Sequence, residues 1–260
     1  MGLFAKFGTS ALDMFRVVGS AGLILWRAIL SLRRLGRSFG LVFEQMQRFG
    51  IESLPLVVIT SVFTGAVAAV QVSYQLKEYL PKAYLGTAIF KSVVIELGPV
   101  LTALVVGGRV GASIAAELGT MRVTEQIDAM EAMAIDPHRY LVMPRLLSGL
   151  IMLPALTVIA DILAIGGGFV VAGVALDVSA KVFVDGMRTL FFEGDVLGGL
   201  IKACAFGGII ALMGCTAGLR AAGGAVGVGQ AATRAVVTSC VLILIGDYIL
   251  TTLLWGILFS

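Results

Sequence analysis

The chain has 260 residues, of which 58% are hydrophobic and only 13% are charged, and its mean hydropathy is +1.01. Charged residues have about half their usual share in globular proteins, so the chain could not cover a soluble surface. The net charge of +3 is too small to indicate a nucleic-acid partner. The composition therefore predicts an integral membrane protein, and the 33 glycines suit close helix packing in lipid.

The first predicted element is a basic, amphipathic segment covering residues 1–52. Apolar residues such as Trp26 and Leu30 are interleaved with arginines such as Arg27 and Arg33. This segment is too charged to span a bilayer, yet apolar enough to lie in the headgroup plane. We predict an interfacial elbow of one or two helices. An additional, poorly hydrophobic span is the alternative.

Residues 53–260 predict a five-span domain, because runs of roughly 20 or more apolar residues mark transmembrane helices. The predicted spans are 53–74, 91–118, 146–176, 196–219 and 235–259. The third span contains Pro154 and a run of three glycines, which favour a tilt, a kink or a break. The fold class is therefore all-α integral membrane. The absence of an internal sequence repeat disfavours inverted-repeat secondary transporters.

The distribution of basic residues predicts the orientation in the membrane. Arginines concentrate in residues 1–52 and in the second and fourth connections between spans. The opposite side carries only Lys77, Lys82, Lys181 and Arg188. We therefore expect a cytoplasmic amino terminus and a carboxyl terminus on the outer side.

Several ionisable residues fall inside the predicted spans, where a charge costs a few kcal/mol and usually serves a function. At about 1.5 Å per residue, Glu96 and Lys202 lie at matching depth near the outer side, so we expect them to interact. Asp161 and Asp247 are expected nearer the midplane. The alternative for the set is an interhelical clamp that only holds the fold: Glu96, Arg109, Asp161, Lys202 and Asp247.

Small residues recur at every fourth position in two of the spans. The second span has Gly107, Gly111 and Ala115, and the fourth has Gly214 and Gly218. This spacing lets helix backbones approach closely. We expect packing within one chain rather than a dedicated dimer motif.

A short cytoplasmic helix is predicted within about residues 120–136. Thr124 is expected to cap it, and Glu125 and Asp128 lie in the first turns, where the helix dipole favours acids. Asp136-Pro137 is expected to end it, since a residue before proline avoids helical geometry.

One face of this helix is apolar, formed by Ile127, Met130 and Ala134. A helix of roughly ten residues is too short to be stable alone in water, so it needs a surface to dock on. We predict docking into a groove on a partner. The alternative is a loop that packs on its own membrane domain.

The chain lacks the residues for metal binding or catalysis. It has one histidine, His138, and its three cysteines fall in apolar stretches without a CxxC spacing, so no metal site is predicted. There is no GxxxxGK[ST] phosphate loop, because the glycine-rich run at 223–230 lacks the lysine. We expect no enzyme activity and no cofactor in this chain.

The stretch ELGPVLTALVVGGRVGASIAAELGTMRVTEQIDAMEAMAIDP, residues 96–137, resembles the signature of the MlaE/YrbE permease family. The stretch GDYILTTLLWG, residues 246–256, also fits that family. The resemblance implies a homodimeric permease in a bacterial inner membrane, acting in an ABC transporter that moves phospholipids or related lipids. The partners that it implies are two cytoplasmic ATPases that bind ATP and Mg²⁺, a periplasmic MCE-domain protein and a small STAS-domain protein.

The resemblance also assigns residues. The family's intramembrane charges match Glu96, Lys202 and Asp247. Its lipid cavity is lined where Gln71 and Tyr74 lie near the outer end of the first span. Its ATPase coupling helix matches residues 125–134, which include Glu125, Ile127, Asp128, Met130 and Glu131. Many relatives have an arginine just before the glutamate of the second span, and this chain has Ile95 there.

Our hypothesis is a lipid permease in which closure of the ATPases moves the cytoplasmic helix. The intramembrane charges would contact the lipid headgroup. Two alternatives from other classes stay open. A proton-coupled secondary carrier would use Asp161 and Asp247 and would work as a single component. A scaffold without transport activity would use the cytoplasmic helix only to tether a partner.

Overall fold

The structure is a computed structural model that describes residues 19, 22–26, 39–76 and 84–258. Every regular element in this part of the chain is a helix. The segments long and apolar enough to cross a membrane are Gly40–Gln75, Tyr84–Val123, His138–Ala175, Glu193–Leu219 and Gly224–Leu254. The predicted fold class, an all-α integral membrane protein with five spans, is confirmed.

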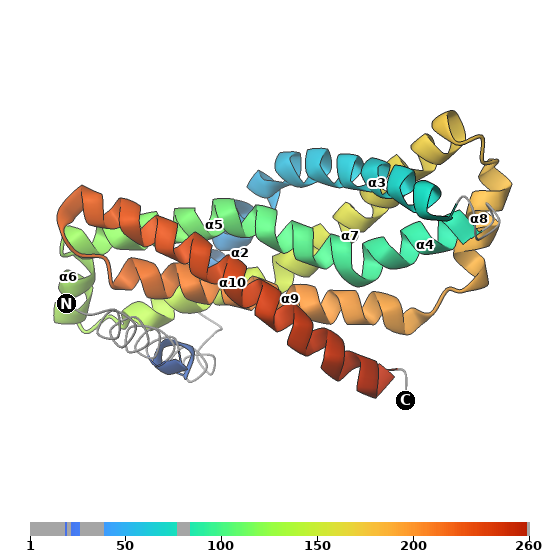
Figure 1. The fold of residues 1–260 in the computed structure, drawn as a ribbon. Helices are drawn as coiled ribbons and strands as arrows, with labels where there is room; N and C mark the ends of the chain where they lie inside the picture. Colours follow the sequence, from blue (N-terminus) through green and yellow to red (C-terminus); the bar gives the residue numbers. More distant parts are fainter. Residues whose placement is uncertain (1–18, 20–21, 27–38, 77–83, 259–260) are drawn as a thin grey trace, which may run out of the picture.

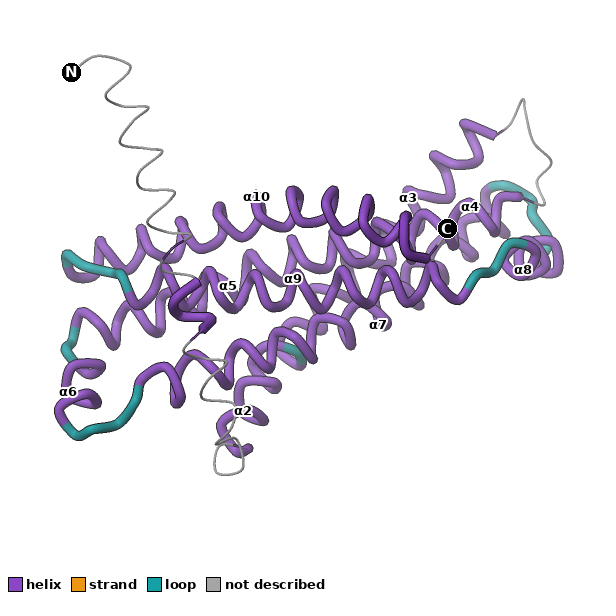
Figure 2. Tube along the Cα trace, turned by 90° about the horizontal axis from the view of Figure 1, so that it is seen from below, coloured by secondary structure: helices purple, strands orange, loops and turns teal. Residues whose placement is uncertain are grey.

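The long helices form an elongated bundle (Figure 1). Helix α5 (Gly98–Val123) packs against α9 (Glu193–Leu219) and α10 (Gly224–Leu258), and Figure 2 shows these three helices side by side. Helix α7 (Met143–Ala175) joins them to α3 (Leu54–Leu76), because it contacts both α9 and α3. Two extended apolar clusters of buried side chains fill the contacts between the helices.

The two ends of the bundle carry short helices. Helix α6 (Gln126–Ala132) caps one end, and α8 (Ala180–Thr189) lies at the other (Figure 1). Helix α4 (Tyr84–Ser92) packs against α8 and leads through a π-helical turn, η3 (Val93–Leu97), into α5. The chain from α4 to α6 therefore runs from one end of the bundle to the other.

Glycines let the helix backbones touch. A Cβ atom built on Gly207 would lie 2.0 Å from the carbonyl oxygen of Gly149, and one built on Gly149 would lie 2.4 Å from that of Gly207. On the α5–α9 contact, Gly214 packs against Ile114 and Gly218 packs against Leu118. The predicted use of the small residues for packing within one chain is confirmed.

Two neighbouring glycines on α7 provide a matched test of this packing. A Cβ on Gly167 would lie 2.4 Å from the carbonyl oxygen of Val62, whereas nothing lies within 4 Å of a Cβ on Gly166. We expect Gly167→Ala to reduce the free energy of unfolding by about 2 kcal/mol through overpacking. Gly166→Ala should leave the melting temperature unchanged or slightly raised. Thermal unfolding of the purified variants in detergent checks both, and equal melting temperatures would contradict the packing described.

Two expectations about the long helices can be compared with the structure. Helix α7 continues without a break through Pro154 and the glycine run, because neighbouring helices support a proline-containing helix in a bundle. The last span begins at Gly224 rather than at residue 235. Its early residues are small and weakly apolar, but Val228 packs near Gly119 of α5, which stabilises the added turns.

The end of the predicted amino-terminal elbow is described, and most of the rest lies outside the described residues. Helix α2 (Phe39–Phe49) packs on α7, where Ser148 Oγ donates a hydrogen bond to the carbonyl oxygen of Val42 at 3.1 Å. A single 3₁₀ turn, η2 (Ile51–Ser53), then leads into α3. The division into 1–52 and 53–260 stays a prediction.

Helix α6 is shorter than predicted, and its caps differ. Glu125 adopts a left-handed conformation (φ 59°) and is the N-cap without a side-chain bond. Thr124 was the wrong cap, because its hydroxyl donates to Thr120 O in the last turn of α5. The helix ends at Ala132, and Ala134 (φ 58°) turns the chain before Asp136-Pro137. Asp136 instead accepts a hydrogen bond from the amide of His138.

Candidate functional site

Three charged residues from three helices meet inside the bundle, and we call them the polar triad: Glu96, Lys202 and Asp247. Lys202 Nζ lies 2.8 Å from Glu96 Oε1 and 3.0 Å from Asp247 Oδ1. Thr251 Oγ1, one turn after Asp247 on α10, lies 3.3 Å from the same Glu96 oxygen. The predicted proximity of Glu96 and Lys202 is confirmed.

The position of Asp247 corrects one sequence prediction. Asp247 was expected nearer the midplane of the membrane than Glu96 and Lys202, but the ion pair places its carboxylate beside Lys202. The last span was assumed to begin at residue 235, and α10 begins at Gly224. Counting depth from the wrong end residue therefore misplaced Asp247 along its helix.

The lysine of the triad is buried and the two acids are partly exposed. The side chain of Lys202 is 2% exposed, that of Glu96 is 41% exposed and that of Asp247 is 21% exposed. Lys202 Nζ also donates a hydrogen bond to the carbonyl oxygen of Ile95 at 3.1 Å. A buried ammonium is tolerable only with such partners, and the two acids and the carbonyl supply them.

Local sequence explains why this carbonyl is available. In an α-helix, the carbonyl of Ile95 would accept a hydrogen bond from the amide of residue 99. Residue 99 is proline, which has no amide hydrogen. The π-helical turn η3 widens the helix at the same place, with the amide of Gly98 bonded to Val93 O. The lysine therefore binds a carbonyl that Pro99 leaves without its usual helical donor.

A second ion pair joins α4 to α9, and it was not among the pairs expected from the sequence. Lys91 Nζ of α4 lies 3.2 Å from Asp195 Oδ2 of α9, and the Asp195 side chain is fully buried. Asp195 lies seven residues, or about two turns, before Lys202 on α9, so both side chains lie on the same face of that helix. Lys91 was read as the first residue of the second span, and Asp195 as a residue of the connection just before the fourth span. Their pairing could have been found by extending the depth comparison of Glu96 and Lys202 to the helix ends.

Gln71 and Tyr74 lie near the end of α3 and are both exposed, with Tyr74 at 84%. No hydrogen bond or ion pair within the described residues joins either side chain to the polar triad. Their assignment to a lipid cavity therefore rests on the family resemblance and stays a prediction.

Arg109 and Asp161 have separate positions. Arg109 Nη1 lies 3.1 Å from Glu52 Oε2, and its Nη2 donates to Ser53 Oγ at 2.9 Å. Arg109 thus clamps α5 to the corner where α3 begins, which matches the alternative of an interhelical clamp. Asp161 Oδ1 is buried against Gly98 and has no hydrogen-bond partner within the described residues.

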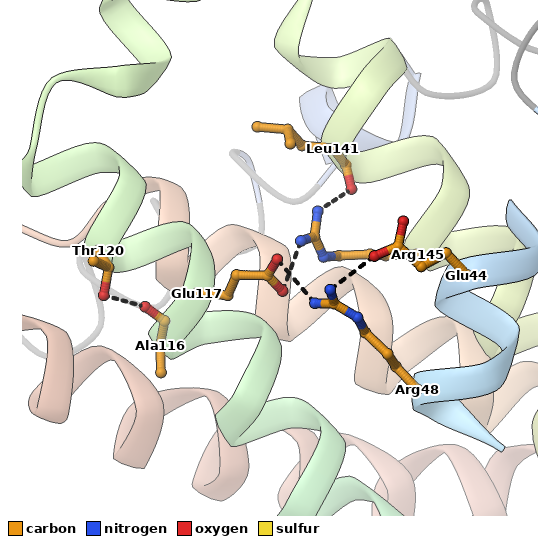
Figure 3. A network of polar contacts seen from close by, with 7 residues as sticks. All are labelled: Glu44, Arg48, Ala116, Glu117, Thr120, Leu141 and Arg145. Atoms are coloured by element: carbon orange, nitrogen blue, oxygen red, sulfur yellow. Dashed lines mark hydrogen bonds and ion pairs between the residues drawn. The ribbon is translucent and has the colours of Figure 1, made fainter. Parts of the chain in front are cut away.

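A polar network lies on the α6 side of Arg109, where α2, α5 and α7 meet (Figure 3). Arg48 Nη1 lies 3.2 Å from Glu117 Oε1 and its Nη2 lies 2.7 Å from Glu44 Oε1. Arg145, only 3% exposed, places Nη2 2.8 Å from Glu117 Oε2 and donates from Nη1 to Leu141 O. A cavity of about 180 Å³ adjoins the network. This network ties α2 to the bundle.

The buried arginine of this network gives a stability prediction. Arg145→Met would leave Glu117 with only the exposed Arg48 as a charged partner. We expect a loss of about 2 kcal/mol in the free energy of unfolding, below the usual value for a buried pair because Glu117 is itself 38% exposed. Arg48→Met, at an arginine that is 48% exposed, is the control and should change stability by less than about 1 kcal/mol. Thermal unfolding measures both losses of stability. Equal losses would show that the burial of Arg145 does not increase the contribution of its ion pair to stability.

The predicted coupling residues lie at the α6 end of the bundle, far from α8 (Figure 2). Glu125, Asp128 and Glu131 are exposed, and Met130 is half-buried. Ile127 is 3% exposed and packs inside the chain, so its side chain orients α6 rather than facing outward. Asp128 also pairs with Arg122 of α5. Just after α6, the large apolar side chain of Met133 is 64% exposed.

The fold and the site define a class: a multi-pass helical membrane protein with charges held inside its spans and a short helix projecting from one end. Residues 42–253 match the family described as Permease MlaE. The chain belongs to the MlaE permease family. It is therefore a membrane transport subunit rather than an enzyme.

Individual relatives agree with this assignment. The chain is 40% identical over 250 residues to a probable ABC transporter permease of Rickettsia conorii, covering 96% of each chain. It is 32% identical over 253 residues to the MlaE permease of the intermembrane phospholipid transport system of Haemophilus influenzae, covering 97% of each. It is also 33% identical over 209 residues to the chloroplast protein trigalactosyldiacylglycerol 1 of Arabidopsis thaliana, covering 80% of this chain and 60% of that protein.

Proposed function

We propose that this chain is the membrane-spanning permease of an ABC transporter that moves phospholipids between the inner membrane and a periplasmic MCE lipid-binding protein. The observation that carries the proposal is the polar triad, a cluster of charges in the spans of a chain that belongs to the MlaE permease family. The Haemophilus influenzae relative is named as part of an intermembrane phospholipid transport system. Charges at such depth are costly and by default indicate a polar cargo or a hydrated path.

Transport energy would come from a separate ATPase that binds ATP and Mg²⁺. The printed sequence has no phosphate-binding loop. Helix α6 is the proposed docking element, because it projects from the bundle with acidic side chains and the apolar Met133 exposed. A small STAS-domain protein bound to the ATPase is part of the same proposed assembly.

The α6 end would face the cytoplasm and the α8 end the periplasm, in agreement with the distribution of basic residues. A second copy of the chain would pack against α10. In the apolar stretch of that helix, only 11% of the residues are buried, against 33–44% in the corresponding stretches of the other spans. Two copies would then enclose a lipid cavity whose wall includes the polar triad, with Gln71 and Tyr74 near its rim.

Native mass spectrometry of the assembly, extracted from its own membrane with lipids retained, tests this function. We expect two copies of this chain, two ATPases, an MCE-domain protein and bound phospholipid. ATP-dependent lipid transfer by the reconstituted assembly is the second measurement. Transport by the purified chain alone under a pH gradient would instead indicate a secondary carrier. Unchanged transfer after neutralising the triad would remove the cluster from the mechanism.

A further inference from the structure

We infer that the polar triad selects phospholipids whose headgroup carries an ammonium group over phospholipids with net negative charge. This inference rests on the proposed function, because it takes the triad to face the lipid. It concerns the sign of the charge that the triad presents, which depends on how its three members are paired and exposed.

The triad carries one excess negative charge. It contains two carboxylates and one ammonium, and Lys202 lies within 3.0 Å of both acids. The residue before Glu96 is the uncharged Ile95, so no arginine balances the second acid. Within the described residues, no other cation lies in ion-pair contact with Glu96 or Asp247.

The lysine is poorly placed to bind a phosphate, because protein acceptors surround its buried nitrogen. An ammonium has three N–H donors. One donates to Ile95 O at 3.1 Å and one to Glu96 Oε1 at 2.8 Å, while Asp247 Oδ1 lies 3.0 Å from the same nitrogen. Lys202 is also only 2% exposed. An incoming phosphate would have to displace a carboxylate and reach a buried nitrogen.

The unused capacity belongs to the acids. Glu96 Oε1 accepts from Lys202, and no described contact uses Glu96 Oε2. The Glu96 side chain is 41% exposed and that of Asp247 is 21% exposed, so the accessible atoms of the triad are acceptors. Acceptors with net negative charge attract an ammonium headgroup and repel an anionic one. Charge-assisted hydrogen bonds of this kind are among the stronger ones in proteins.

The test uses the complete transporter reconstituted in vesicles with equal amounts of phosphatidylethanolamine and phosphatidylglycerol. Mass spectrometry of the retained lipids and the initial rate of ATP-driven transfer of each lipid are measured. We expect phosphatidylethanolamine to be favored about tenfold, a ratio that one charge-assisted contact can supply. Equal retention and equal rates of the two lipids would overturn the inference while leaving the proposed function standing.

Two variants change the charge in different ways. Ile95→Arg adds a cation beside Glu96 without removing any member of the triad, and it should bring the preference to about one or reverse it. Glu96→Gln removes the excess charge and should shift the preference in the same direction, even if Ile95→Arg folds poorly. Ile95→Met is the matched control and should keep the preference for phosphatidylethanolamine. An unchanged preference in both charge variants would overturn the inference.

The failure of the proposed function would look different. In that case no phospholipid would be retained, and ATP would drive no transfer of either lipid. A transporter that moves both lipids at the same rate contradicts only the selection by headgroup charge.

Discussion

Replacing Lys202 with methionine is expected to abolish lipid transfer and to lower the free energy of unfolding by about 3 kcal/mol. The substitution leaves two carboxylates, Glu96 and Asp247, next to each other without the cation that lies 2.8 and 3.0 Å from them. Two partly buried carboxylates that are close together repel each other. Neither acid has another charged partner within the described residues. ATP-dependent transfer and thermal unfolding of the reconstituted complex measure the two effects.

The double variant separates a shared role from independent ones. Glu96→Gln alone should also damage transfer, and adding it to Lys202→Met should cost less than the sum of the two single losses, because one interaction is removed twice. Lys181→Met on α8 is a matched control at an exposed lysine. It should leave unfolding unchanged. Strictly additive losses in the double variant would show that Glu96 and Lys202 act independently.

Replacing an exposed acid by a base and an exposed apolar residue by an acid at the α6 end is expected to detach the ATPase. Glu131→Lys with Met133→Asp replaces an exposed acid of α6 and an exposed methionine just after it. Both changes lie outside the buried contact of Ile127, so α6 should stay folded. We expect the ATPase to be lost from the purified complex and transfer to stop. Co-purification and transfer assays measure these outcomes.

The control for this variant places similar changes at the other end of the bundle. Lys181→Glu with Val182→Asp alters two exposed residues of α8 and should leave the ATPase bound. A complex that keeps its ATPase after Glu131→Lys with Met133→Asp would mean that α6 is not the docking element. The short helix would then pack only on its own membrane domain, as in the alternative from the sequence.

The fold and part of the site could be predicted because both follow from distances along the chain: the length of apolar runs and the number of residues from a helix end. Apolar length predicts the spans, and counting residues from the outer helix ends brought Glu96 and Lys202 to one depth. The same count failed for Asp247, because the weakly apolar start of α10 gave no signal for its true beginning. Depth can be read from a sequence only when the end of the helix can be read first.

Pairs that a comparison of depths does not single out could not be predicted from the sequence. Glu117 and Arg145 were visible as charges near span ends, but nothing in their spacing indicates that both meet Arg48 of α2. The prediction of the α6 caps was wrong for a related reason. Thr124 has the side chain of a cap, yet α5 continues to Val123 and uses its hydroxyl in the last turn. Packing of the whole bundle decides between such local options.

The bond between Lys202 and the backbone at position 95 has a consequence for how this site varies among related sequences. The bond uses a carbonyl, which every amino acid supplies, and Pro99 removes the helical amide that would compete for it. The side chain at position 95 can therefore change without detaching the lysine. Substitution there alters the charge of the site at little structural cost, so position 95 is where we expect relatives with different cargo to diverge, while Pro99 stays fixed.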